Sequence, residues 1–189
     1  MFIRKENEND YQAIRTLIKQ VFAGVAEANL VDEVRETKGF ISELSLVFEK
    51  DGQIIGHVLF SPVTIKTFRP EKQEIANTKK YLAITPLSVA SEYQNQGIGK
   101  SLIDFGIDKA KSLGFNAIIA FGDAEFYHEF GFKPSYTWDL FPPFEVDDKE
   151  NVLGLEFEMG ALLDGIIEFP PEFDCLYSHE CKVYKESSL

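Results

Sequence analysis

The chain has 189 residues, which is long enough for one domain with a sizeable hydrophobic core. Its formal net charge of −12 argues against a nucleic-acid partner, because a phosphate backbone requires a basic surface. No apolar run approaches the roughly 20 residues that cross a bilayer, and the first residues lack the apolar segment of a signal peptide. The two cysteines, Cys175 and Cys181, predict neither a disulfide framework nor a metal site. We therefore expect a cytoplasmic protein without a membrane partner.

The first half of the chain predicts strands with two amphipathic helices. A short strand over residues 2–4 precedes a helix capped by Asp10, and a second helix covers residues 27–37. Their inward positions are Ile14, Leu17, Ile18, Val21 and Phe22 in the first, and Leu30, Val31 and Val34 in the second. Strands over residues 44–49 and 54–66 are joined by the turn Asp51-Gly52. The charged segment 67–78 is expected to be an exposed hairpin loop.

The second half contains a strand–helix–strand unit. An apolar strand over residues 81–90 leads to a helix over 99–112 and a buried strand over 116–121, which has the size of a parallel βαβ unit. The helix is expected to bury Leu102, Ile103, Phe105 and Ile107. A small helix over 124–130 ends at Gly131, and two strands follow at 153–159 and 166–169. The predicted class is α/β, with a mixed α+β sheet that is antiparallel in its front half.

The segment from Gln94 to Ser101, between the strand and the helix, has the character of a phosphate-binding loop. Free backbone N–H groups at a helix N-terminus can surround a pyrophosphate. Glycine is needed at 97 and 99, because a Cβ atom would hold the backbone away from the phosphates or forbid its dihedral angles. A dinucleotide fingerprint requires glycine where Leu102 stands, and a P-loop requires it where Gln94 stands. Both of these nucleotide motifs therefore fail on a required residue.

Two motifs together resemble the Gcn5-related N-acetyltransferase (GNAT) family. Gln94-x-x-Gly97-x-Gly99, after the strand end Leu87-Ser88-Val89, resembles motif A of that family. The heptapeptide Phe126-Tyr127-His128-Glu129-Phe130-Gly131-Phe132 is similar to motif B, an aromatic residue and a tyrosine followed by an apolar residue, glycine and phenylalanine. Further stretches at 28–32, 60–63, 121–123 and 160–162 resemble the bacterial YhbS-like subgroup of predicted acetyltransferases. The similarity covers residues 1 to about 173.

The resemblance implies a GNAT-like fold. In that fold a central, mostly antiparallel sheet contains a splayed parallel strand pair, which opens a V-shaped cofactor cleft, and helices flank the sheet. A single domain over 1–189 is expected, with a motif core over about 44–135 and C-terminal strands and a tail over 136–189. The implied co-substrate is acetyl-CoA, with no metal. Its pantetheine would pair with the strand edge and its pyrophosphate with the loop, through Leu87, Ser88, Val89, Gln94, Asn95, Gln96, Gly97, Ile98, Gly99, Lys100 and Ser101.

The resemblance also implies the reaction. An N-acetyltransferase, of the acyltransferase class, would move an acetyl group to a primary amine of an unidentified small molecule or peptide by direct attack on the thioester. A backbone N–H near Val89 would polarise the thioester carbonyl, and Tyr127 would protonate the departing thiolate. The alternative for Tyr127 is a packing residue that hydrogen-bonds the cofactor sulfur. Dimers are common among relatives, so a homodimer stays open.

The sequence does not identify a general base. Many relatives carry a glutamate where Ala83 stands, so the role passes to another group or to water. The candidates are Glu33, Glu43, His57, Glu92 and Asp123, although a helix-cap role is expected for Asp123 and a packing role for His57. This gap leaves a second hypothesis, a non-catalytic CoA-binding sensor or interaction module on the same fold. Three tail residues, Trp138, Phe141 and Phe144, are expected to be core, with an acceptor pocket as the alternative.

Overall fold

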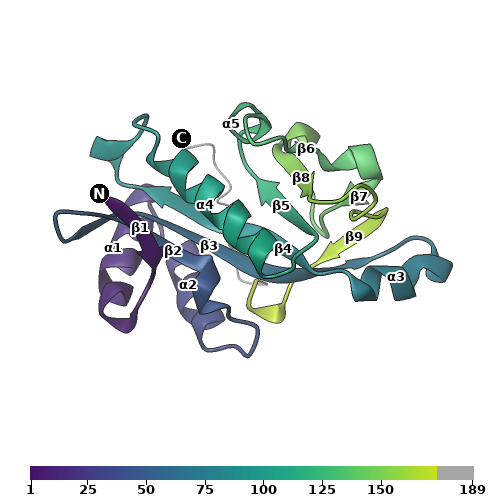
Figure 1. Ribbon diagram of the computed structural model, residues 1–189, viewed down its shortest axis with the longest axis horizontal. Helices are drawn as coiled ribbons and strands as arrows, with labels where there is room; N and C mark the ends of the chain where they lie inside the picture. The colour runs from purple at the N-terminus through teal and green to yellow at the C-terminus, as the bar shows by residue number, and fades with distance from the viewer. Residues whose placement is uncertain (174–189) are drawn as a thin grey trace. The chain divides into compact units, whose positions relative to one another are not determined.

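Nine strands and five α-helices form a mixed α/β structure in the computed structural model, which describes residues 1–173 (Figure 1). The strands are β1 (Phe2–Lys5), β2 (Ser45–Lys50), β3 (Gln53–Lys66), β4 (Tyr81–Val89), β5 (Ala117–Phe121), β6 (Lys133–Pro134), β7 (Leu140–Phe141), β8 (Val152–Glu156) and β9 (Gly165–Glu168). The helices are α1 (Tyr11–Val21), α2 (Ala26–Arg35), α3 (Gln73–Thr78), α4 (Ile98–Ser112) and α5 (Ala124–His128). The main sheet is mostly antiparallel and includes the parallel pair β4–β5, with helices flanking it, as predicted.

The described residues group into two compact units. The first contains Met1–Ser61, Thr85–Lys109 and the two residues Glu172 and Phe173, and the second contains Pro62–Ile84 and Ala110–Pro171. Strands β3 and β4 and helix α4 each contribute residues to both units. The single domain over residues 1–189 stays a prediction, and the two cysteines lie outside the described residues.

Strand alternation organises the first unit. Antiparallel strands β1, β2 and β3 are joined in order, and Asp51 and Gly52 make the predicted hairpin turn with φ angles of 50° and 80°. Successive β3 side chains point to opposite faces of the sheet. Gly56 therefore faces Ile98 at the start of α4, whereas His57 faces the side of α2. Figure 1 shows α1 and α2 on one side of these strands and α4 on the other.

A buried ionic cluster ties α2 to the strands of the first unit. Arg35 donates two hydrogen bonds of 2.8 Å to Glu6, and their side chains are 3% and 2% exposed. The Nε2 atom of His57 lies 3.5 Å from Glu6 and 3.0 Å from the hydroxyl of Ser45. Burial alone would raise the pKa of Glu6, but the hydrogen bonds from Arg35 and His57 outweigh it and lower the pKa to about 2. Glu6 therefore stays ionised inside the fold.

The second unit has its own apolar core around β5. Three residue pairs, from Tyr81–Ala117 to Ala83–Ile119, make the parallel β4–β5 register, and β8 pairs antiparallel with β5. The core residues are Val63, Ile65, Tyr81, Ala83, Ala117, Ile119, Leu140, Val152, Ala161, Leu162 and Ile167, with Trp138 packed against them. The hydroxyl of Tyr81 donates to the carbonyl of Ala161 at 3.1 Å, and burial raises the pKa of Tyr81 to about 12. The predicted core role of Trp138 is confirmed.

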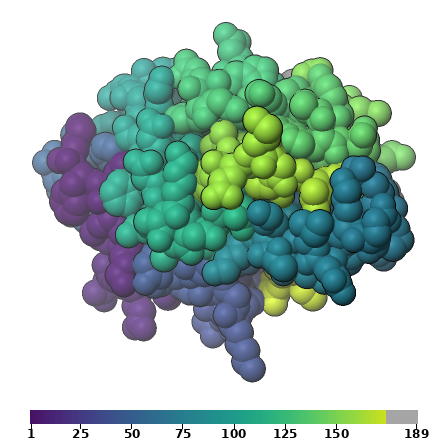
Figure 2. Space-filling model, turned by 45° about the vertical axis from the view of Figure 1, so that its right-hand side comes forward, coloured from purple at the N-terminus to yellow at the C-terminus, as the bar shows by residue number. Residues whose placement is uncertain are grey.

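The segment 67–78 differs from its prediction. It contains a 3₁₀ turn over Pro70–Lys72 and the helix α3 in place of a hairpin loop. Side chains hold it: Gln73 accepts from the backbone of Thr67, and Arg69 forms an ion pair with the buried carboxylate of Asp164. In Figure 2 this blue-teal segment lies beside the yellow-green chain around β9. The Arg69–Asp164 ion pair is a tertiary contact, which local sequence patterns do not encode.

Smaller differences have local causes. The carboxylate of Asp10 accepts from Arg4 and from the backbone of Asn7, so Asp10 makes no side-chain cap for α1. Phe105 is 41% exposed, because it falls outside the arc of α4 that Leu102 and Ile103 bury. The two-residue strands β6 and β7 are too short for periodicity to indicate them.

The ionic cluster makes stability depend on Glu6. We expect Glu6→Gln to lower the free energy of unfolding by about 3 kcal/mol at pH 7, because Arg35 loses its buried counter-charge. The unfolded chain binds a proton near pH 4.5 but the fold does so only near 2, so the native protein should lose stability as pH falls between these values. The Glu6→Gln variant should lose less free energy of unfolding over that pH range, because it lacks the titrating carboxyl group. Urea unfolding from pH 7 to pH 2.5 measures both effects.

Glu8→Gln serves as the control, because Glu8 is exposed in the adjacent 3₁₀ turn. It should change the free energy of unfolding by less than about 0.5 kcal/mol. Equal effects of the two substitutions would contradict a stabilising role for the cluster.

Candidate active site

The loop between β4 and α4 presents a row of unused backbone donors. After a 3₁₀ turn over Ser91–Tyr93, Asn95 and Gly97 take φ angles of 57° and 80°, and α4 begins at Ile98. Within the described part of the chain, the N–H groups of residues 95–99 donate to no protein acceptor. These donors precede the first intrahelical bond, from the N–H of Ser101 to the carbonyl of Gly97 at 2.9 Å. The segment can therefore accept an anion at several N–H groups at once.

Other hydrogen bonds hold the loop in shape. The side-chain amide of Gln94 donates to the carbonyl of Val89 at 3.2 Å, and that of Gln96 donates to Glu92 at 3.0 Å. The hydroxyl of Ser101 donates to the carbonyl of Gly97 at 2.9 Å. A Cβ atom built on Gly97 would meet no protein atom within 4 Å, so this backbone faces open space. The loop is thus stabilised through its carbonyls, which leaves its N–H groups for a ligand.

The end of β4 supplies the remaining predicted cofactor residues. Leu87 and Val89 are half-buried and share one face by alternation, while Ser88 between them is buried. The Ser88 hydroxyl has no hydrogen-bond partner among the described residues. In the helix, Ile98 is 5% exposed and anchors the loop, whereas Lys100 is exposed and belongs to the first turn. All eleven predicted cofactor residues therefore lie in the first unit.

Tyr127 lies in the second unit, on the short helix α5. Its side chain is 4% exposed, and its ring makes edge contacts with Phe126 and Phe132 at centroid distances of 5.0 and 5.3 Å. A Cβ atom on Gly122 would come within 3.3 Å of the ring, so glycine at 122 leaves the space that the ring occupies. Its phenol is thus held in a fixed direction by packed aromatic groups. A fixed hydroxyl suits a proton donor, and it equally suits a hydrogen bond to a cofactor.

The candidate bases separate by environment. Glu33, Glu43 and Glu92 are exposed. Asp123 accepts the N–H of Glu125 at 2.8 Å and caps α5, which confirms the predicted helix-cap role. Ala83 is fully buried beside its β5 partner Ile119 and offers no polar atom.

His57 is fully buried, and burial lowers its pKa although Glu6 opposes the shift. Its Nδ1 atom has no hydrogen-bond partner among the described residues, while Nε2 contacts Ser45 and Glu6. His57 therefore belongs to the buried ionic cluster with Glu6 and Ser45, which agrees with the packing role predicted for it.

One titratable side chain stands out that the sequence reasoning did not select. Glu27, in the first turn of α2, is 5% exposed, and burial raises the pKa of its carboxyl group. A buried carboxyl with a raised pKa is a typical feature of functional sites. The pattern offered only a weak signal, because an acidic residue in a first helical turn is usually explained by the helix dipole.

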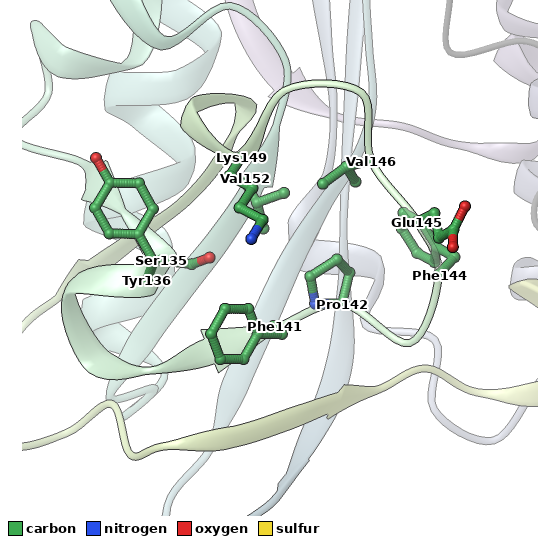
Figure 3. Close-up of a pocket in the computed structure, with 9 residues that line it drawn as sticks. All are labelled: Ser135, Tyr136, Phe141, Pro142, Phe144, Glu145, Val146, Lys149 and Val152. Atoms are coloured by element: carbon green, nitrogen blue, oxygen red, sulfur yellow. The ribbon is translucent and has the colours of Figure 1, made fainter.

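A pocket of about 260 Å³ opens in the second unit (Figure 3). Its lining includes Phe141 and Phe144, two of the residues for which core and acceptor-pocket roles were both considered. Both are half-buried, and Phe144 also packs near Phe121 and Phe169, at ring-centroid distances of 5.8 and 6.2 Å. These residues thus combine an apolar packing side with a face on the pocket.

Residues 1–173 contain neither a metal-binding cluster nor a membrane-spanning helix. No cluster of three or more His, Cys, Asp or Glu side chains is arranged to hold a metal ion. No helix in this part of the chain has the length and apolar character to span a membrane.

Known proteins match this chain in sequence and in structure. The model of the acetyltransferase (GNAT) family matches residues 9–132. The chain is 32% identical over 140 residues to the uncharacterized N-acetyltransferase YhbS of Escherichia coli K12, covering 74% of this chain and 78% of that protein. A match of this length includes most of the predicted motif core over residues 44–135.

Two solved structures are similar over 92% of the chain. The first is E. coli YhbS in complex with CoA, with a TM-score of 0.78, 30% identity and 91% of that chain covered. The second is a GNAT family acetyltransferase from Brucella melitensis in complex with acetyl-CoA, with a TM-score of 0.71, 28% identity and 97% of that chain covered. Both complexes support the expectation of an acetyl-CoA co-substrate. This chain therefore belongs to the acetyltransferase (GNAT) family and is an N-acetyltransferase, as its two motifs predict.

Proposed function

We propose that this protein transfers the acetyl group of acetyl-CoA to a primary amine, by direct attack of the amine on the thioester. The row of unused N–H groups over residues 95–99 carries the proposal, because it matches a pyrophosphate in charge and in hydrogen-bonding type. The CoA-bound relatives point to the same ligand.

The loop would hold the cofactor by backbone alone. Several N–H groups and the positive end of the α4 dipole favour the pyrophosphate charge, and Lys100 adds a cation in the first turn. The glycines let the backbone approach the phosphates, with Gly97 already in the left-handed region. This part of the site recognises CoA without depending on any one side chain.

The end of β4 would hold the pantetheine. The β4–β5 register contains Tyr81 to Ala83 and no later residue of β4, so the backbone of Leu87 and Val89 is outside that ladder. A pantetheine arm has amide groups that can pair with such a strand edge, as an added strand does. The buried Ser88 hydroxyl, which has no partner among the described residues, offers one further polar contact.

The reaction then requires few groups. The amine nitrogen forms a bond to the thioester carbonyl carbon, whose oxygen takes up negative charge near the backbone N–H groups at Val89. The attacking nitrogen gives up one proton to water, the C–S bond breaks, and the thiolate takes a proton from the hydroxyl of Tyr127. Water then returns a proton to Tyr127, so the proton lost by the amine balances the one gained by the thiol. The attacking amine must arrive without its extra proton. Since Ala83 cannot remove it, the rate should rise with pH until the acceptor amine is fully deprotonated.

The alternative that the sequence left open was a non-catalytic CoA-binding module. Ala83 favours it, because the position where many relatives carry a glutamate holds a methyl group. Incubation with acetyl-CoA and a panel of amines, with free thiol as the readout, separates the two. CoA binding without thiol release across the panel would favour the module.

The loop can be tested by adding a side chain to it. We expect Gly97→Val to weaken CoA binding by about 100-fold or more, because the branched side chain occupies the open space that the phosphates need. The matched control is Gly52→Val, since Gly52 has the same φ of +80° and the same absence of neighbours within 4 Å. Calorimetric titration with CoA should show the native affinity in the control. Native affinity in both variants would contradict the loop assignment.

Tyr127 can be tested by removing only its hydroxyl. We expect Tyr127→Phe to lower kcat by about 100-fold and to change CoA affinity by less than about threefold, because the proton is needed only as the thiolate leaves. Tyr81→Phe removes another buried hydroxyl of the second unit, one that bonds the Ala161 carbonyl, and should leave kcat near native. A native kcat in the Tyr127→Phe variant would exclude the role of Tyr127 as general acid.

A further inference from the structure

Four buried side chains of the first unit carry polar atoms without a hydrogen-bond partner. Among the described residues, these atoms are Nδ1 of His57 and the hydroxyl oxygens of Ser61, Thr85 and Ser88. All four residues lie on the adjacent strands β3 and β4, and each is 1% exposed or less. Buried polar groups are normally hydrogen-bonded, so a concentration of unsatisfied ones in one place indicates a bridging water or a functional role.

Strands β3 and β4 are neighbours in the sheet and run in opposite directions. Tyr81, at the start of β4, shares the core of the second unit with Ile65, near the end of β3. Just beyond the end of β4, the N–H of Ala90 donates to the carbonyl of Ile55, near the start of β3, at 2.9 Å. This last bond sets the register of the two strands within the first unit.

The register brings Ser88 opposite His57, because each lies two residues along its strand from the bonded pair. Opposite side chains share one face of the sheet, with Cβ atoms about 5 Å apart. A hydroxyl and an imidazole at that separation can be joined directly, by rotation about one side-chain bond, or through one water. The two unsatisfied atoms can therefore satisfy each other.

The other nitrogen of His57 determines where the ring holds its proton. Nε2 lies 3.5 Å from a carboxylate oxygen of Glu6, which can only accept a hydrogen bond. Nε2 therefore carries the proton, and Nδ1 keeps a lone pair that can take another. The charged groups that face the ring are Glu6, which follows β1, and Arg35 on α2, whereas Ser45 on β2 and Ser88 on β4 are neutral. Burial lowers the pKa of His57, so the ring is neutral at pH 7 and able to accept a proton.

Ser88 also borders the place where the thioester would lie. In the proposed site the backbone of Leu87 and Val89 binds the pantetheine, and the side chain of Ser88 points to the opposite face from theirs. Helix α4 packs on the face of Leu87 and Val89, close against Gly56 of β3. An amine therefore reaches the thioester from the face that Ser88 and His57 share.

We propose that Ser88 and His57 form a proton relay for the attacking amine, in place of the carboxylate that is missing at Ala83. As the nitrogen bonds to the thioester carbon, its proton passes to a water, which gives one of its own protons to the Ser88 oxygen. The Ser88 hydroxyl proton moves at the same time to Nδ1 of His57. The ring then carries two protons beside the Glu6 carboxylate and returns one to solvent along the same path. His57 acts through Ser88 and touches no substrate. This inference rests on the proposed acetyl transfer, for which it supplies the missing proton acceptor.

Removing the Ser88 hydroxyl tests the link, in assays with acetyl-CoA and ethylamine or any panel amine that releases thiol faster. We expect Ser88→Ala to lower kcat at least about tenfold and to change the KM for acetyl-CoA less than about twofold, because only the proton path is lost. Ser88→Thr keeps a hydroxyl and should restore most of kcat. The matched control is Thr85→Val, which removes another buried hydroxyl of β4 that has no partner among the described residues and is not opposite His57. Weaker acetyl-CoA binding with a native kcat in Ser88→Ala would make Ser88 a cofactor contact and overturn the relay.

The solvent isotope effect distinguishes a proton relay from a structural role. In single-turnover measurements, the native rate should fall about threefold in D2O and depend on the deuterium fraction along a curve, because several protons move together. His57→Gln keeps an amide that can donate to Glu6 but cannot take up the proton, so its isotope effect should be smaller and its dependence linear. Equal isotope effects in the native protein and in His57→Gln would overturn the relay. If His57→Gln fails to fold, the same comparison with Ser88→Ala decides.

Long-range ¹H–¹⁵N spectra of the full chain test the geometry without any substrate. We expect the His57 ring to carry its proton on Nε2, and its Nδ1 resonance to shift in Ser88→Ala and not in Thr85→Val. A proton on Nδ1 would overturn the relay. The expected spectra with no thiol release from any amine would overturn the proposed acetyl transfer and leave a hydrogen-bonded pair. Thiol release that is equally fast in Ser88→Ala would keep the acetyl transfer and overturn the relay.

Discussion

The mutual packing of β3 and α4 is the constraint on which the cofactor loop depends. A Cβ atom on Gly56 of the strand would lie 3.0 Å from Ile98 and from Leu102 of the helix. A Cβ atom on Gly106 of the helix would lie only 2.2 Å from the ring of Phe60. Each element therefore uses a glycine to receive the large side chains of the other, and this close approach fixes the helix along the strand. Ile98 is the first residue of α4, so the contact that positions the helix also positions its N-terminal donors.

The net charge of −12 and an anionic cofactor are compatible because the interactions differ in range. Salt reduces the field of exposed carboxylates beyond about 8 Å, whereas N–H groups in contact with a phosphate are hardly screened. In the proposed site, the local donors of residues 95–99 would thus decide cofactor binding. The remaining acidic charge acts at longer distance, where it disfavours nucleic acid.

The sequence predicted the elements that carry periodic patterns or glycine turns. The strand–loop–helix over β4 and α4, the Asp51-Gly52 hairpin and the parallel pair all follow from local rules that the fold obeys. The prediction of an exposed hairpin loop over 67–78 was wrong. The helix in this segment depends on a hydrogen bond from Gln73 to the carbonyl of Ile65 and on the contact of Arg69 with the distant Asp164. The predicted burial of Phe105 was also wrong. Its hydrophobicity suggested burial, but its angular position on α4 leaves the side chain exposed. The buried state of Glu27 could not be predicted, since burial of a charged residue is decided by what packs over it.

The proposed donor loop and the pocket of the second unit present different chemical groups. The loop offers backbone N–H groups, so many side chains there could change without altering what the loop binds, provided that the glycines keep their dihedral angles. The pocket, which is lined by residues of the segment 135–152, offers side chains on short strands and turns, where Pro142 and the acidic segment 145–150 make few regular backbone hydrogen bonds. Changes in that region alter shape and charge without disturbing the core around Tyr81 and Ile119. Under the proposed function, such a fold could keep one acetyl donor while the residues of the pocket change, because the loop and the pocket share no residues.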